Sequence, residues 1–84
     1  MSGIRMTAEE VAIGFCKEKG SDAWWRLKNW LWEGDRLSLK ARSQCKNMGR
    51  ILGRNEDPSE KLSIPCMKHW EDAIRIYEWD PDDR

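Results

Sequence analysis

Cys66 and His69 are the residues whose types and spacing are best suited to chemistry. A Cys-x-x-His pattern on a helix can present two metal ligands, or a thiol nucleophile and its base, on one face. Together with Cys16 and Cys45 they would make a zinc set of three cysteines and one histidine. These two cysteines stand singly within the apolar stripes of separate segments, however, whereas zinc modules usually supply ligands in close pairs. We therefore interpret the cysteines as small core residues and predict no metal site.

The sequence offers little else for catalysis. The adjacent carboxylates Glu71 and Asp72 point apart on a helix, and nothing in the sequence holds Asp82 and Asp83 in place. Neither the G-x-x-x-x-G-K-[ST] nor the G-x-G-x-x-G phosphate-binding motif occurs. We therefore predict no catalytic residue and no cofactor, and we expect that the protein is not an enzyme.

A strongly basic segment is the clearest candidate for binding. Residues 35–55 carry six basic side chains against one acidic side chain, a net charge of +5, and residues 56–84 carry −5. The formal net charge of zero therefore hides two opposite regions. Asn47 or Gln44 could reach base edges. The residues expected to bind a nucleic acid or an acidic partner are Arg36, Lys40, Arg42, Lys46, Asn47, Arg50 and Arg54. Two alternatives stay open: pairing with the acidic third of the same molecule, or a merely solvated helix face.

Six tryptophans are many for a chain of 84 residues. Trp25 and Trp32 are seven positions apart, so they lie close together on one side of a helix and flank Lys28. Trp79 also lies off the predicted apolar stripes. We predict that these three rings stay partly exposed and, with Lys28, bind a partner, because tryptophan beside a cation is typical of binding hot spots. The alternatives are a stacking platform for single strands, or a wide core that absorbs every ring.

Helices must position these residues, since apolar side chains recur at helical spacing along the chain. Thr7 and Glu10 match a capping box and predict a helix over residues 8–19 that Gly20 ends. Ser21 or Asp22 can cap a second helix over residues 22–33, with Gly34 after its end.

Two further helices are predicted over residues 37–53 and 65–79. Asp35 or Ser38 can begin the first of them, whose apolar stripe lies opposite the basic side chains. Pro65 suits the first turn of the other, because proline lacks an amide hydrogen that would be unpaired there. Residues 55–63 are predicted as a loop and residues 80–84 as an acidic tail. The predicted inner face of the last helix comprises Cys66, Trp70, Ala73, Ile74 and Tyr77.

This pattern predicts an all-α fold: a single small domain of about four short helices, with an orthogonal or bundle-like arrangement. The odd number of cysteines, without short spacing, is not typical of a disulfide-stapled secreted module. No segment of the sequence resembles a signal peptide or is apolar enough for a membrane span. We therefore expect a cytoplasmic protein without a membrane partner.

Two functions are consistent with these features. The sequence favours a non-enzymatic helical module that binds a protein partner, because tryptophans are in surplus and no catalytic set is present. The size of the chain suggests a phage or mobile-element accessory protein that inhibits or redirects a larger host machine. The alternative is a DNA- or RNA-binding regulator that presents the basic helix of residues 38–54 to phosphates.

Overall fold

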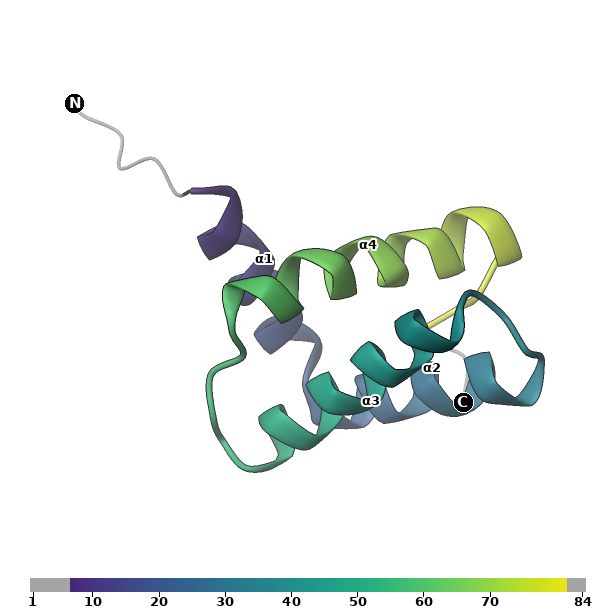
Figure 1. Cartoon of the computed structure of the whole chain (residues 1–84), viewed down its shortest axis with the longest axis horizontal. Helices are drawn as coiled ribbons and strands as arrows, with labels where there is room; N and C mark the ends of the chain where they lie inside the picture. The colour runs from purple at the N-terminus through teal and green to yellow at the C-terminus, as the bar shows by residue number, and fades with distance from the viewer. Residues whose placement is uncertain (1–6, 82–84) are drawn as a thin grey trace.

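The four helices begin at residues whose local chemistry accounts for their bounds. The computed structural model describes residues 7–81, and its helices are α1 (Ala8–Lys19), α2 (Ser21–Glu33), α3 (Leu39–Gly53) and α4 (Glu60–Tyr77) (Figure 1). The side chains of Thr7, Ser38 and Ser59 cap α1, α3 and α4 by accepting a hydrogen bond from the first helical turn. Gly20 joins α1 to α2 with a φ of 83°, a conformation that favours glycine. The predicted all-α fold of four short helices is confirmed.

The helix α3 begins two residues later than predicted. Leu37 takes a positive φ of 58°, which is not helical, and Ser38 then caps the first turn. The helix runs without a break through Gly49 to its predicted end at Gly53. Gly49 is buried because the ring of Trp25 packs directly against it, so a residue that is unfavourable for a helix serves the contact between α2 and α3.

The predicted bounds of the last helix are wrong at both ends. Ser59 caps α4 and Glu60 begins it, so Pro65 lies inside the helix, beyond the first turn. The helix ends at Tyr77 because Glu78 takes the left-handed conformation, with φ 57° and ψ 32°. Residues 82–84 of the predicted acidic tail lie outside the described residues.

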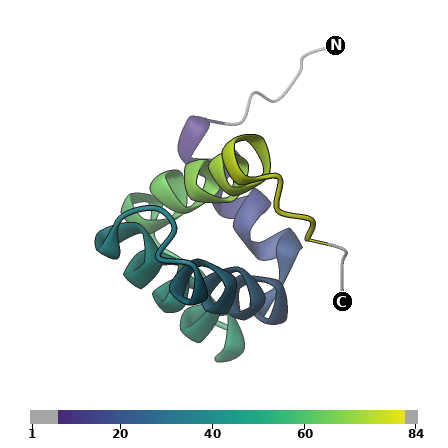
Figure 2. The ribbon, with the colours of Figure 1, turned by 90° about the vertical axis from the view of Figure 1, so that its right-hand side faces the viewer.

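The helices form a ring in which each packs on two neighbours (Figures 1 and 2). Both α1 and α3 pack on α2 and on α4. The prediction for the inner face of α4 is wrong for Ile74 and Tyr77, which are each 41% exposed. Ile74 lies at the margin of the buried side of α4, and Tyr77 is the last residue of the helix. The core draws on all four helices and comprises Cys16, Ala23, Trp24, Leu27, Leu31, Cys45, Met48, Cys66, Trp70, Ala73 and Trp79. Within residues 7–81, no helix is both long and apolar enough to cross a membrane.

Candidate functional site

The three cysteines are free thiols that lie fully buried in the core, one each on α1, α3 and α4. Burial raises the pKa of Cys16 to about 12. A hydrogen bond with the Cys45 thiol, together with burial, also raises the pKa of Cys66. All three cysteine side chains pack among the other buried residues of the core. Among the residues that the structure describes, no group of three or more histidine, cysteine or acidic side chains is arranged to hold a metal ion.

His69 joins α4 to α3 and does not pair with a cysteine. Its Nε2 lies 2.7 Å from Oε1 of Gln44, and burial lowers its pKa. The Cys66 thiol donates instead to the Gln44 carbonyl oxygen, over 3.4 Å. The Gln44 side chain is therefore used inside the fold, so the prediction that it could reach base edges is not supported, and Asn47 remains the candidate for such contacts.

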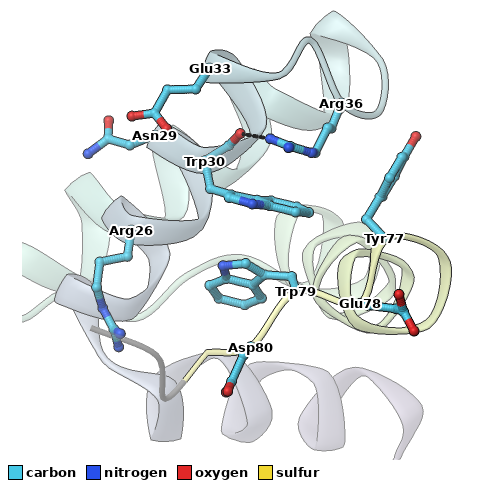
Figure 3. Close-up of a pocket in the computed structure, with 9 residues that line it drawn as sticks. All are labelled: Arg26, Asn29, Trp30, Glu33, Arg36, Tyr77, Glu78, Trp79 and Asp80. Atoms are coloured by element: carbon cyan, nitrogen blue, oxygen red, sulfur yellow. Dashed lines mark hydrogen bonds between the residues drawn. The ribbon is translucent and has the colours of Figure 1, made fainter.

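An open groove of about 510 Å³ lies between α2 and the end of α4 (Figure 3). The Trp30 ring forms its wall, between the Arg36 guanidinium and the Trp79 ring, whose centres lie 4.1 and 5.9 Å from the Trp30 centroid. Arg36 also donates to the Trp30 carbonyl oxygen, and Arg26 donates to the Pro81 carbonyl oxygen, each over 2.7 Å. Arg36 was predicted to join the basic binding residues, and the structure places it in this groove instead, because it precedes α3. The groove carries charges of both signs and defines no single class of ligand.

Trp79 is buried, so the prediction that its ring stays exposed is wrong. It is only 9% exposed and lies 4.9 Å from the Trp70 ring, centroid to centroid. The left-handed conformation of Glu78 turns the chain back toward the core directly before Trp79. Because the residue follows the end of the helix, the helical spacing used for the prediction does not apply to it. Trp79 therefore holds the chain end against the core and offers little surface to a partner.

The other predicted partner residues lie along the contact between α2 and α3, which we call the α2–α3 seam. Trp32 is 39% exposed, and the Arg42 guanidinium lies over its ring, 4.6 Å from the centroid. Trp25 is half-buried, with the Lys28 ammonium 5.4 Å from its ring centroid. A Cβ atom added to Gly49 would lie only 3.1 Å from Nε1 of Trp25, so α3 covers this ring from another side. Both rings therefore already carry a cation from the same molecule.

Most of the predicted basic residues share one exposed surface, which we call the outer face of α3. It comprises Lys40, Ser43, Lys46, Asn47, Arg50 and Arg54, all exposed, with Arg54 at the C-terminal cap. These side chains project away from the buried side of the helix, where Ala41, Cys45 and Met48 lie. Its four cations make no side-chain hydrogen bond, ion pair or ring contact with any other described residue. The outer face of α3 thus presents four charges of one sign that have no partner within residues 7–81.

No ion pair joins this face to the part of the acidic third that the structure describes. Arg42 is the basic residue of α3 that has an acidic partner in the described chain, and this partner is Asp35, at 3.0 Å, from the basic segment itself. Asp57 pairs with Lys17 on α1. On α4, Asp72 pairs with its own helix neighbours Lys68 and Arg75, and the hydrogen bond from Arg75 lowers the pKa of Asp72. Intramolecular pairing of the two charged regions, one of the alternatives for the basic segment, is therefore contradicted within residues 7–81.

The structure divides the predicted site residues among three places. The outer face of α3 gathers Lys40, Lys46, Asn47, Arg50 and Arg54. The α2–α3 seam holds Trp25, Lys28, Trp32 and Arg42, whereas the groove holds Arg36 and Trp79. Sequence reasoning did not single out Trp30, which forms a wall of the groove. Comparison with family models, curated proteins and solved structures finds no match to this chain.

Proposed function

We propose that the protein is a small non-enzymatic module that binds nucleic acid by contacting phosphates with the outer face of α3. The observation that supports this most is the set of four cations without a partner among the residues that the structure describes. Each lysine or arginine that neutralises a phosphate releases condensed counterions, which drives binding. Ser43 and Asn47 stand among the cations and add hydrogen-bonding groups of the kind that commonly contact phosphates.

The composition of this face suits phosphates better than a protein surface. Its six side chains are all charged or polar. The buried centre of a protein interface is instead rich in aromatic and apolar groups and poor in lysine. Burial of Trp79, and the half-buried position of Trp25, also weaken the argument from exposed tryptophans that favoured a protein partner. For these reasons nucleic-acid binding takes precedence over the protein-binding function that the sequence favoured.

The test compares charge reversals at two exposed helical cations, one on the outer face of α3 and one on α4. Arg50→Glu changes an exposed cation on the outer face of α3, and Lys61→Glu makes the same change of sign on α4, where Lys61 is also exposed. Fluorescence anisotropy with labelled DNA and RNA should show that Arg50→Glu weakens binding by on the order of tenfold, and that Lys61→Glu weakens it less than about twofold. Failure of the unaltered protein to bind any nucleic acid at low salt, or equal losses in both variants, would contradict the proposal.

A second candidate function is protein binding at the α2–α3 seam. Two apolar side chains are exposed beside Arg42: Trp32 at 39% and Leu39, one helical turn earlier, at 59%. An exposed tryptophan and an arginine are typical anchors of a protein interface, and a partner bound there would be inhibited or redirected by this small module. In affinity capture from nuclease-treated host extract, Trp32→Ala should abolish recovery of the partner and leave nucleic-acid binding intact. Recovery that is unaffected by Trp32→Ala would reject this candidate.

A further inference from the structure

The rings and cations around α3 also bear on the form of nucleic acid that this face fits. We infer that the outer face of α3 binds double-stranded nucleic acid and contacts about four phosphates. This inference rests on the nucleic-acid binding proposed above. DNA and RNA duplexes both provide the charged phosphate backbone that this face would contact.

The seam tryptophans beside this face each carry a cation over the ring, which disfavours stacking on bases. Proteins that bind single strands without sequence preference use the flat faces of aromatic side chains as platforms for successive bases. Trp25 has Gly49 against its indole and Lys28 over its ring, and Trp32 lies beneath Arg42. On each ring the cation covers a face of the indole, and a base would compete with it for that face. A single strand would therefore gain less from stacking here than on an uncovered ring.

Another exposed aromatic ring, Tyr77, lies at the C-terminal end of α4 and is not part of the outer face of α3. It lines the groove with Arg26, Asn29 and Glu33 of α2. Its ring packs edge to face against the Trp30 ring of α2, 6.0 Å from centroid to centroid. Tyr77 therefore belongs to the groove and not to the outer face of α3.

The cations form a row on a regular helix, which suits a regular array of phosphates. From Lys40 to Arg54 the helical rise gives a length of about 21 Å, and Lys46, Arg50 and Arg54 follow at steps of about 6 Å. A duplex presents about one charge per 1.7 Å of its axis, so a row of this length meets several phosphates without bending of the nucleic acid. A flexible single strand would lose conformational entropy when held along the same row. Duplex binding is therefore favoured over single-strand binding.

The number of free cations fixes an expected response to salt. Four phosphates neutralised on B-form DNA give a slope of about −3.6 for the logarithm of the binding constant against the logarithm of salt concentration. Substitution of one cation, as in Arg50→Ala, should reduce the magnitude of that slope by about 0.9. The control Lys61→Ala on α4 should leave the slope unchanged.

The experiment titrates the full chain with four probes of matched length: a DNA duplex, an RNA duplex, the corresponding single-stranded DNA, and polyglutamate. Circular dichroism verifies that each variant is folded. We expect one or both duplexes to bind at least about tenfold more tightly than the single strand and polyglutamate at the same salt concentration, with the stated slope for the DNA duplex. The two duplex arms distinguish DNA from RNA.

Single-strand affinity equal to or above that of both duplexes would overturn the inference while leaving the proposed function in place, especially if Trp25→Ala or Trp32→Ala weakens it. A slope that Arg50→Ala does not change would overturn the inference and would also contradict the phosphate contacts of the proposed function. Equal binding of polyglutamate and duplex would show that the face recognises charge alone and would also reject duplex recognition. Absence of binding to every nucleic-acid probe would instead reject the proposed function itself.

Discussion

Trp25 and Trp32 of the α2–α3 seam lie in different environments from Trp70 of α4 and Trp79, which follows the end of α4. Trp25 and Trp32 lie at the surface of the seam, each with a cation over its ring. Trp70 and Trp79 lie edge to face in the core, where 4% and 9% of their surface is exposed. Trp79 has acidic neighbours in the sequence, yet its ring is more deeply buried than the rings of Trp25 and Trp32. Neighbouring charge in the sequence therefore does not indicate an exposed ring, because the path of the backbone decides which ring enters the core.

The largest effect expected from this difference is on stability. Trp79→Ala should lower the free energy of unfolding by about 3–5 kcal/mol, because it removes a large ring from a packed core. Trp32→Ala should lower it by less than about 1 kcal/mol, because this ring is already partly in water. Urea unfolding followed by far-UV circular dichroism measures both values without relying on tryptophan fluorescence. Similar losses for the two variants would mean that the two groups of rings do not differ as described.

Much of this fold could be predicted from local signals. Thr7 and Gly20 bound the first helix at the predicted residues, because capping and the left-handed conformation act within a few residues of the chain. The start of α4 was missed because the sequence offers two possible starts, with Ser59 as the N-cap or with Pro65 in the first turn. Only the packing of the residues that follow Ser59 decides between them. Burial of Trp79 was missed because it depends on a left-handed residue after the helix, where periodicity ends.

The candidate site could be predicted in part. The helical phase of Lys40, Lys46, Arg50 and Arg54 places them together on the side of α3 away from the core, as the structure has them. Whether these charges are free could not be predicted, because the acidic third could have folded against them. The same limit applies to Gln44, since its bond to His69 joins two helices that are distant in the sequence. The periodicity of side chains along one helix does not reveal the contacts of that helix with another.

A smaller effect tests how closely the seam is packed. Gly49→Ala should lower stability by about 1 kcal/mol, because the added methyl group meets the Trp25 ring and the resulting strain exceeds the gain in helix propensity. Gly14→Ala is the matched control, since nothing lies within 4 Å of the added Cβ atom and Gly14 is exposed inside α1. It should raise stability by up to about 1 kcal/mol, measured by the same urea unfolding. Equal stabilisation by both alanines would show that Trp25 is not held against α3.

The smallest effect concerns the hydrogen bond between His69 and Gln44, which joins α4 to α3. His69 on α4 is half-buried and bonded to Gln44 on α3, and burial lowers its pKa from the ordinary value of 6.5. Below that value the unfolded chain binds a proton that the folded chain resists, so stability is complete above about pH 6.5 and falls as the pH drops through the pKa of the folded state. Asp72 has its own lowered pKa, below an ordinary value of 3.8, so it stays ionised in this range and does not contribute.

The measurement is the melting temperature of the unaltered protein and of His69→Gln between about pH 7.5 and about pH 5. Glutamine can still bond to Gln44 but does not titrate, so the melting temperature of the variant should fall less on acidification than that of the unaltered protein. Parallel curves for the two proteins would show that the histidine contributes nothing to the pH dependence. A steeper fall in the variant would mean that protonated His69 stabilises the contact between α3 and α4, the reverse of what its burial implies.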